Sequence, residues 1–304
     1  MYKVDAVVVT YNRLDLLKRC LNAIMNQTYP VNKILVVNNN STDGTSDYLN
    51  YISSKYSFVK PISLEKNIGG AGGFNEGIKE FIKNSHDSYV WVMDDDTIPS
   101  NDALEKIMIK INPKLNFGFL CSNVRWKDGH VSKMNIPDPA TDWNELASKG
   151  LIKINSTSFV SVLFPRKVII RYGLPIKEYF IWGDDVEFTR RVTQDELNGY
   201  MVANSLVEHE IKKNIGSDIV SEEDSNRIRR YYLARRNTIF TMKKRYPRKE
   251  LVKWTMRSLL INPIKIMLKS PNKKVLRIRY EIGGTLSGFF FRPKIQKFVL
   301  RKKR

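Results

Sequence analysis

The sequence has few cysteines and no long apolar run. Its two cysteines, Cys20 and Cys121, lie far apart without metal-ligand spacing, so neither a disulfide framework nor a cysteine metal site is expected. No stretch of about eighteen uncharged apolar residues occurs, which argues against a membrane-spanning helix. The apolar run at residues 4–9 is too short for the core of a secretory signal peptide. These absences favour a globular protein of a reducing compartment.

Acidic residues are almost missing from the last quarter of the chain. Residues 227–304 contain 25 of the 51 lysines and arginines but only two acids, Glu250 and Glu281, a net charge of +23. Residues 1–226 carry a net charge of −3, so a near-neutral body is followed by a cationic tail. Such a tail needs a polyanionic neighbour, either a membrane surface or nucleic acid.

The first hundred residues alternate between short apolar runs and helical patterns. The runs predict strands over residues 6–10, 33–38, 58–64 and 89–93. Helical spacing predicts helices over residues 13–26, 46–54 and 72–83, the last opened by a glycine-rich turn. This alternation predicts an α/β fold with a mostly parallel central sheet and helices on both faces. Further along, strands are expected over residues 117–121 and 156–164, a loop over 135–143 and a helix over 185–192.

Polar side chains follow each of the first four predicted strands. They occupy residues 11–13, 38–40, 65–67 and 94–96. Because open α/β sheets bind ligands at the carboxyl ends of their strands, these positions are candidates for one binding site.

The acidic triplet Asp94, Asp95 and Asp96 is the first candidate for chemistry. Adjacent carboxylates repel one another, and a divalent ion would relieve that repulsion and bridge a substrate diphosphate. A solvated acidic turn before a helix is the alternative, which the position at the predicted ligand edge makes the weaker one.

Two polar segments could cradle a nucleotide. Residues 39–45 are rich in amide, hydroxyl and carboxylate groups, which are equally typical of a turn and a helix cap. Residues 67–75 contain four glycines, which allow a ligand to approach the backbone or a turn to pack on the sheet.

A second acidic site follows Trp182 and Gly183. Asp184 and Asp185 precede a helical pattern, so they could simply cap a helix, or one of them could act as a general base for an acceptor hydroxyl. The tryptophan offers a flat face for a sugar ring. His209, one of three histidines, is a plausible third ligand for a carboxylate-bound ion.

Together these motifs resemble glycosyltransferase family 2, the inverting enzymes of GT-A fold. The resemblance rests on residues 7–13, 39–45, 94–96 and 182–185, whose order and spacing agree with the family over about residues 4–210. The glycine-rich segment and the Trp-Gly-Asp-Asp sequence look most like the branch of bacterial galactofuranosyltransferases and rhamnosyltransferases.

The resemblance implies roles for individual residues. Asp185 would be the catalytic base, with Asp184 beside it, and Asp94 and Asp96 would bind Mn²⁺ or Mg²⁺. In galactofuranosyltransferases a histidine some two dozen residues beyond the base completes the metal site, and His209 stands there. The predicted donor-binding residues are Thr10, Tyr11, Asn12, Arg13, Asn39, Asp43, Asn67, Gly70 and Asp95. The predicted acceptor-binding residues are Trp182 and Gly183.

We therefore expect a catalytic domain over residues 1–226, with a nucleotide-sugar half over about 1–112 and an acceptor half over about 113–226. A basic helical region follows over 227–304. The expected reaction transfers galactofuranose from UDP-galactofuranose, with inversion, to a hydroxyl of a lipid-linked or nascent cell-surface polysaccharide such as O-antigen or capsule. A dTDP-L-rhamnose donor is the alternative, because Asn38 or Asn39 stands where many relatives use an aspartate for uracil.

The tail interleaves apolar and basic residues, a pattern typical of an interfacial amphipathic region. This predicts a cytoplasmic protein held peripherally on the inner face of the cell membrane. The alternative is a solvated helical bundle that packs on the catalytic domain or joins copies of the chain into a homo-oligomer. A nucleic-acid-binding module is the rival class, but the tail has no zinc-finger spacing or RNA-binding aromatic signature, so no nucleic acid is expected. A nucleotidyltransferase would also use paired aspartates, yet it fits the Trp-Gly-Asp-Asp sequence poorly.

Overall fold

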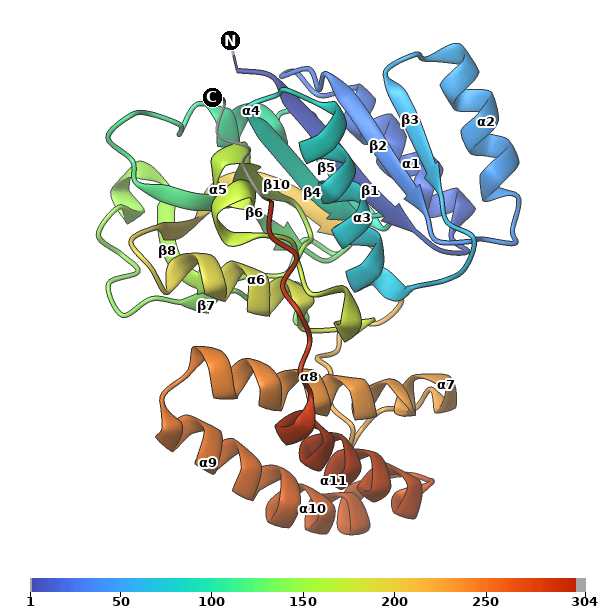
Figure 1. The fold of residues 1–304 in the computed structure, drawn as a ribbon, viewed down its shortest axis with the longest axis vertical. Helices are drawn as coiled ribbons and strands as arrows, with labels where there is room; N and C mark the ends of the chain where they lie inside the picture. Colours follow the sequence, from blue (N-terminus) through green and yellow to red (C-terminus); the bar gives the residue numbers. More distant parts are fainter. Residues whose placement is uncertain (1, 299–304) are drawn as a thin grey trace.

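A mixed sheet forms the centre of the molecule in the computed structural model, which describes residues 2–298 (Figure 1). Its strand order is β3-β2-β1-β4-β9-β6-β10-β8-β7, and β5 pairs with β10. The strands are β1 Val4–Thr10, β2 Lys33–Asn38, β3 Val59–Ser63, β4 Tyr89–Asp94, β5 Thr97–Pro99, β6 Phe117–Arg125, β7 Asp138–Pro139, β8 Leu151–Ser156, β9 Val162–Pro165 and β10 Asn198–His209. β3, β2, β1 and β4 run parallel, whereas β9 runs antiparallel to both β4 and β6. The predicted α/β class and its parallel first half are confirmed.

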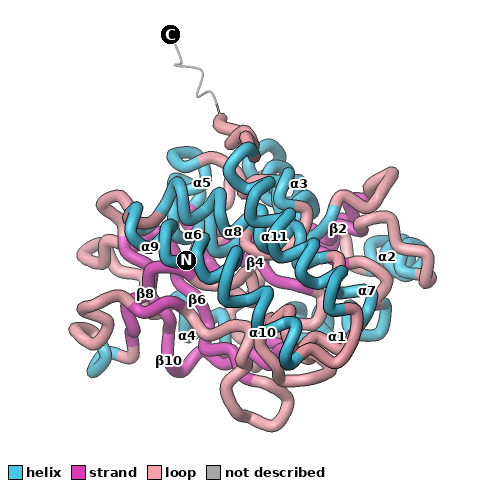
Figure 2. Tube along the Cα trace, turned by 90° about the horizontal axis from the view of Figure 1, so that it is seen from below, coloured by secondary structure: helices cyan, strands magenta, loops and turns pink. Residues whose placement is uncertain are grey.

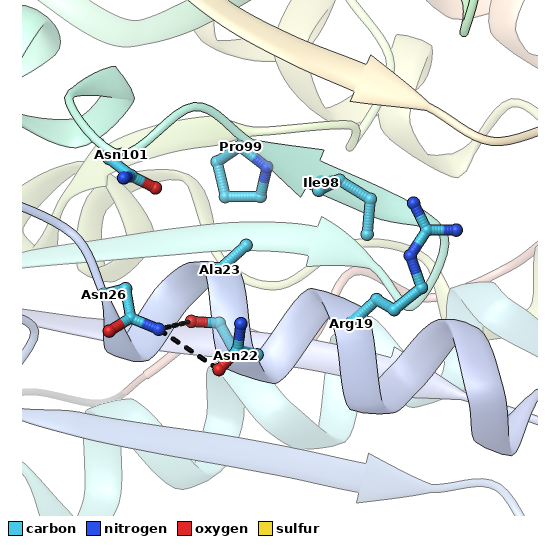
Figure 3. A pocket seen from close by; sticks show the side chains of 7 residues that line it. All are labelled: Arg19, Asn22, Ala23, Asn26, Ile98, Pro99 and Asn101. Carbon is cyan, nitrogen blue, oxygen red and sulfur yellow. Dashed lines mark hydrogen bonds between the residues drawn. The ribbon is translucent and has the colours of Figure 1, made fainter.

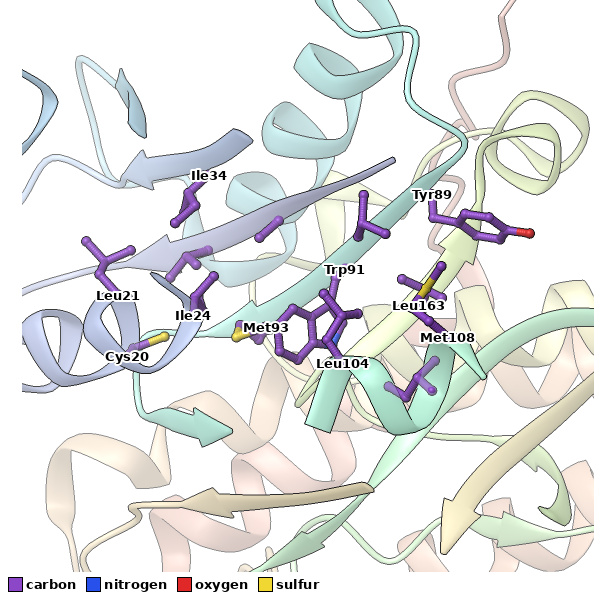
Figure 4. Packing of buried hydrophobic residues seen from close by; sticks show 14 of the residues in the cluster. Cys20, Leu21, Ile24, Ile34, Tyr89, Trp91, Met93, Leu104, Met108 and Leu163 are labelled. Carbon is purple, nitrogen blue, oxygen red and sulfur yellow. The ribbon is translucent and has the colours of Figure 1, made fainter. Parts of the chain in front are cut away.

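Helices cover both faces of this sheet. Because side chains alternate along a strand, Ala6 and Val8 of β1 pack on one face, and Val7 and Val9 on the other. The first face is covered by α1 Leu14–Met25, α2 Thr45–Lys55 and α4 Ala103–Met108, and the second by α3 Gly69–Asn84, α5 Arg166–Tyr172 and α6 Asp184–Thr193. Figure 4 shows the first cluster, in which Trp91 of β4 lies between α1 and α4. This packing fixes the β4 end that carries the acidic triplet.

The single strand predicted over residues 156–164 is wrong. β8 ends at Ser156 and β9 begins at Val162, and Ser161 between them adopts a positive φ of 70°. This backbone turn brings the Ser161 hydroxyl to the indole N–H of Trp91, which donates to it at 2.9 Å. The interruption therefore satisfies a buried polar group that the local pattern did not reveal. The loop predicted over residues 135–143 also contains the short strand β7.

The glycine-rich segment lies inside a helix instead of forming the turn before it. α3 begins at Gly69, three residues earlier than predicted. A Cβ atom on Gly69 would lie 1.9 Å from the carbonyl oxygen of Phe180, and one on Gly73 would lie 2.4 Å from a methyl carbon of Val9. The glycines thus let the start of α3 pack directly on β1 and on the loop that precedes α6.

The C-terminal region is helical, as predicted, and lies below the sheet in Figure 1. Its helices are α7 Ser225–Ile228, α8 Arg230–Arg245, α9 Arg248–Met256, the π-helical turn η3 Arg257–Ile261, α10 Asn262–Lys269 and α11 Lys274–Phe290; the short 3-10 turns η1 Ala147–Lys149 and η2 Lys177–Tyr179 precede them in the chain. Within residues 2–298, no helix has both the length and the apolar character needed to cross a membrane. The predicted boundary after residue 226 falls inside α7 and stays a prediction, and residues 299–304 of the predicted basic region lie outside the described residues.

Two sets of contacts hold the C-terminal helices against the part of the chain that contains the central sheet, which we call the sheet domain. The guanidinium of Arg245, at the end of α8, donates to the buried carboxylate of Glu187 in α6 at 2.7 and 2.9 Å. Residues 291–298, which we call the return segment, run back from α11 along the sheet domain, where Leu174 N–H donates to Gln296 O at 2.9 Å (Figure 1).

Candidate active site

The parallel strands bring the predicted polar residues to one edge. In the sheet register Val9 of β1 lies beside Asp94 of β4, and Thr10 lies beside Asn38 of β2. The carboxyl ends of these strands therefore meet, as the sequence predicted.

Asp95 is turned back into the protein. Its carboxylate accepts hydrogen bonds from the Thr10 hydroxyl at 2.7 Å and from the Tyr11 N–H at 3.3 Å. The Arg13 guanidinium pairs with both Asp95, at 3.2 Å, and Asp96. Burial raises the pKa of Asp95 to about 6, although the positive charge of Arg13 opposes the shift. Asp95 thus holds the carboxyl end of β1, together with the Arg13 side chain, close to Asp94 and Asp96.

Asp94, Asp96 and His209 form a cluster with the chemistry of a metal site. Each offers a ligand atom, and these atoms lie within 4.8 Å of one another. Burial, followed by the charges of Asp96 and Asp95, raises the pKa of Asp94 well above its usual value. A cation at the cluster would remove that repulsion.

The hydrogen bonds of His209 support a cation at the same place. Its Nδ1 lies 2.7 Å from Oδ1 of Asn135, and the Asn135 amide is itself held by Ser132 and Ser158. Its Nε2 lies 3.1 Å from Oδ1 of Asp96. A proton on Nε2 or a cation between the two atoms would make this contact favourable. Two carboxylates and an oriented imidazole fit a divalent ion such as Mn²⁺.

The second acidic pair begins helix α6. Trp182 and Gly183 adopt left-handed conformations, with φ of 64° and 92°, and the helix starts directly after them. Burial, followed by the charge of Asp185, raises the pKa of Asp184 well above its usual value. Burial also raises the pKa of Asp185, although its carboxylate accepts from the backbone N–H of Val186 at 2.7 Å.

Helix α8 holds the loop that leads to these acids. The side-chain N–H₂ of Asn237 donates to the carbonyl oxygens of Tyr179, Ile181 and Trp182 at 3.0, 3.1 and 2.9 Å. Asn237 is buried, and Phe180 within the loop has a positive φ of 65°. A residue of the C-terminal region thus sets the path of the backbone before Asp184.

One cavity of about 850 Å³ brings both acidic sites together, a volume typical of a small-molecule site. The predicted residues that line it are Asn12, Arg13, Gly70, Asp94, Asp96, Trp182, Asp184, Asp185 and His209. Its wall also contains four basic residues that the sequence did not single out, Lys212, Lys213, Arg227 and Arg230. Arg227 and Arg230 come from the basic C-terminal region, so that region forms part of the cavity as well as its support.

The other predicted site residues are not among the described lining residues of this cavity. They are Thr10, Tyr11, Asn39, Asp43, Asn67, Asp95 and Gly183. The Asn39 amide donates to Gly69 O and accepts from Ile68 N–H, both at 2.9 Å, so it anchors the start of α3. Asp43 accepts from Leu14 N–H at 2.9 Å and joins the starts of α1 and α2. Their contact with a donor stays a prediction.

A second hollow lies between α1 and β5 (Figure 3). Its lining residues are Arg19, Asn22, Ala23, Asn26, Ile98, Pro99 and Asn101. Of these, Asn26 is held by Asn22, to which its side-chain N–H₂ donates at 2.8 and 3.1 Å. None of these described residues is a carboxylate or an imidazole, so the hollow lacks the groups that the larger cavity offers for catalysis.

The chain resembles known proteins both in sequence and in fold. It is 26% identical over 198 residues to glycosyltransferase AglE of Haloferax volcanii, which covers 62% of this chain and 61% of the relative. It is 26% identical over 217 residues to galactofuranosyltransferase GlfT1 of Mycolicibacterium smegmatis, covering 64% and 66%. The chain thus spans less than two thirds of the length of these curated relatives.

Solved structures agree on the fold. The crystal structure of GalNAc-T7 with UDP, GalNAc and Mn²⁺ superposes with a TM-score of 0.66 at 13% identity, over 92% of this chain and 54% of that one. The crystal structure of Staphylococcus aureus TarS 1–349 gives a TM-score of 0.57 at 15% identity, over 92% of both chains. The predicted GT-A fold is therefore confirmed. The model of the glycosyl transferase family 2 matches residues 5–162, more than half of the sequence, and the chain belongs to that family.

Proposed function

We propose that this protein is a metal-dependent, inverting glycosyltransferase that moves a sugar from a nucleotide-sugar donor to an acceptor hydroxyl. One observation carries the proposal: the Asp94, Asp96 and His209 cluster and the acids Asp184 and Asp185 line the same cavity. A donor diphosphate needs a cationic environment and an acceptor needs a base, and this cavity offers groups for both.

Asp185 is the proposed base. Its carboxylate takes the proton from the acceptor hydroxyl, and the oxygen attacks the anomeric carbon from the side opposite the leaving group. A new C–O bond forms, the bond to the nucleotide diphosphate breaks, and the configuration inverts. Trp182 gives the acceptor ring an apolar face, and Arg13, Arg227 and Arg230 offer positive charge for the departing diphosphate.

Asp94, Asp96 and His209 would hold the ion, which when bound supplies charge stabilisation to the leaving diphosphate. The contact between Asn135 and Nδ1 holds the His209 ring so that its Nε2 points at that position. Mn²⁺ is the first candidate because the ligand set mixes carboxylates with an imidazole, and Mg²⁺ is the second.

UDP-galactofuranose is the proposed donor, supported by the similarity to GlfT1. dTDP-L-rhamnose is the alternative, because the uracil-recognising aspartate of many relatives is an asparagine here, and Asn39 is occupied by the start of α3. The proposed acceptor is a lipid-linked or growing cell-surface glycan at the inner face of the membrane, supported by the cationic C-terminal region.

A donor screen tests the proposal. Purified protein with Mn²⁺ is offered UDP-galactofuranose, dTDP-rhamnose and common UDP-hexoses, and nucleotide diphosphate release is measured with and without a chelator. We expect release from one donor, lost on chelation. Asp185→Asn should abolish transfer and keep donor affinity, whereas Asp96→Ala should weaken Mn²⁺-dependent donor binding in calorimetry. Normal turnover by Asp185→Asn, or unchanged affinity of Asp96→Ala, would contradict the assigned roles.

A further inference from the structure

Helices α9, η3 and α10 form one continuous helical segment, residues 248–269, which we call the outer helix. It lies on the side of the molecule farthest from the sheet, with α8 between it and the sheet domain (Figure 1), and Figure 2 views the molecule from that side. Pro263 has no N–H, and the helix accommodates it with a π turn in which Asn262 N–H donates to Arg257 O.

The inner face of the outer helix is fixed to the rest of the protein. Ile266 is buried and packs with Ile219 and Tyr231. Asn262 is also buried, and its amide donates to the carboxylate of Glu281 in α11 at 2.5 Å. These contacts determine which side of the helix faces solvent.

The solvent-facing side of the outer helix carries a row of exposed apolar side chains. Leu260, Ile264 and Leu268, spaced four residues apart, are 53%, 62% and 75% exposed. Other exposed apolar side chains of the outer helix and the start of α11 are Val252, Met256, Ile261, Met267 and Val275. Because folded monomers rarely expose a contiguous apolar stripe of this kind, the face calls for a partner.

Exposed cations accompany this stripe. Lys253, Arg257, Lys265 and Lys269 lie on the same helix, whose one acid is Glu250. The fitting partner therefore has an apolar interior under an anionic surface. A bilayer with anionic lipids has both, nucleic acid lacks the apolar part, and an apolar protein interface does not require this excess of positive charge.

We infer that the outer helix binds an anionic lipid bilayer, lying in the plane of its surface, through Leu260, Ile264, Leu268 and their apolar neighbours. With the outer helix on the bilayer, helix α8 would lie between the membrane surface and the sheet domain that carries Asp185. Ile266, on the back of the helix, packs with Tyr231, whose ring meets Trp182 of the cavity wall edge-on at 5.1 Å. The presentation of a lipid-linked acceptor to Asp185 rests on the proposed function. The binding of the outer helix to lipid does not.

Vesicle co-sedimentation of the full chain tests the inference. Vesicles of phosphatidylglycerol and phosphatidylcholine should bind the protein, pure phosphatidylcholine should bind it weakly, and high salt should reduce binding without abolishing it. The triple variant Leu260→Asn, Ile264→Asn and Leu268→Asn keeps every charge and should lower the vesicle-bound to free ratio by roughly tenfold or more.

The matched control changes two exposed isoleucines of the sheet domain, Ile109→Asn and Ile136→Asn, which are 66% and 62% exposed. It should bind vesicles like the original protein. Equal vesicle binding by the triple variant would overturn the inference. It would also be overturned if analytical sedimentation showed a dimer for the original protein and a monomer for the triple variant, because the face would then be an interface between two copies of the chain. Binding to duplex DNA in place of vesicles would overturn it too. Donor hydrolysis without vesicles should be normal in the triple variant, so a failure of lipid binding is distinguishable from a failure of the proposed chemistry.

Discussion

Asp5 is a fully buried carboxylic acid at the far end of β1 from the cavity. Neither of its carboxylate oxygens has a hydrogen-bond partner among the described residues. Burial, together with the neighbouring Asp87, raises its pKa to about 7. Asp5 is therefore protonated in the folded protein at a pH where the unfolded chain ionises it.

The sign of the pH dependence follows from this raised pKa. Between its ordinary value of 3.8 and about 7, the folded state binds more protons than the unfolded state, so stability falls as the pH rises. We predict that Asp5→Asn unfolds at higher urea concentration than the original protein at pH 8, and that this advantage shrinks toward pH 4.

Urea unfolding at several pH values measures this effect. Asp15→Asn, an exposed acid on α1, is the control and should give the same small difference at every pH. A pH-independent difference for Asp5→Asn would mean that the Asp5 carboxyl does not titrate in the folded protein within this range.

The sequence identified four of the eight acids that line the cavity, Asp94, Asp96, Asp184 and Asp185, because acids directly after an apolar run or before a helical pattern are a local signal. It did not identify Asn135, which lies 74 residues from His209 in the chain and meets it only through the fold. The sequence could not single out Arg227 and Arg230 as cavity residues for a different reason. They belong to a long basic region in which no local pattern distinguishes one cation from another. Asn39 and Asp43 lie at helix starts, which the same amide and carboxylate oxygens also serve, and their contact with a donor stays a prediction.

At the scale of elements, helix α8 positions the loop that carries Trp182 and leads to the two acids at the start of α6. Asn237 makes three hydrogen bonds to that loop, and losing them would leave the partly buried carbonyl oxygens of Ile181 and Trp182 without this donor. We predict that Asn237→Ala lowers kcat by roughly ten- to a hundredfold, because small displacements of a base are costly. The donor KM should change little, since the residues of the proposed metal site, Asp94, Asp96 and His209, belong to other elements.

Steady-state kinetics together with thermal unfolding measure this effect. Asn262→Ala provides the control, because Asn262 is also a buried asparagine of the helical region but bonds to Glu281. It should lower the Tm and leave kcat unchanged. If both variants lose activity in proportion to their loss of stability, Asn237 is structural and not a positioning residue.

Local patterns predicted the regular elements of the first hundred residues well, because strands in a parallel sheet are short continuous apolar runs. They failed at the break before Ser161, where Phe159 and Val160 prolong the apolar run of the next strand while the backbone turns toward Trp91. They also misplaced the start of α3, because glycines usually mark turns, and here they permit close packing on Phe180 and Val9.

At the scale of the whole molecule, the return segment joins the C-terminal helices to the sheet domain. Its first residue, Phe291, packs against Tyr179 of the loop before α6 and Phe240 of α8, with ring centroids 6.0 and 5.6 Å away. The Arg236 guanidinium lies 4.0 Å from the centre of the Phe291 ring. We predict that Phe291→Ala lowers the free energy of unfolding by about 2 kcal/mol, because a partly buried aromatic contact between the C-terminal helices and the sheet domain is lost.

The adjacent Phe290→Ala is the control, because Phe290 is 81% exposed and should change the stability by less than about 0.5 kcal/mol. Urea unfolding, followed by both circular dichroism and fluorescence, measures the change. If both variants changed the free energy of unfolding by similar amounts, the Phe291 contact would not be what holds the C-terminal helices to the sheet domain.

Trp182 has a consequence for how the protein can be observed. It is one of five tryptophans, and it stands half-buried on the cavity wall between Tyr231 and the guanidinium of Arg227, 5.7 Å from its ring. Trp91, in contrast, is fully buried in the core and lies away from the cavity lining. The emission colour of an indole depends on the polarity around it, and a sugar ring laid on Trp182 would displace water from its face. The protein therefore carries its own optical probe of an occupied cavity, readable without any label.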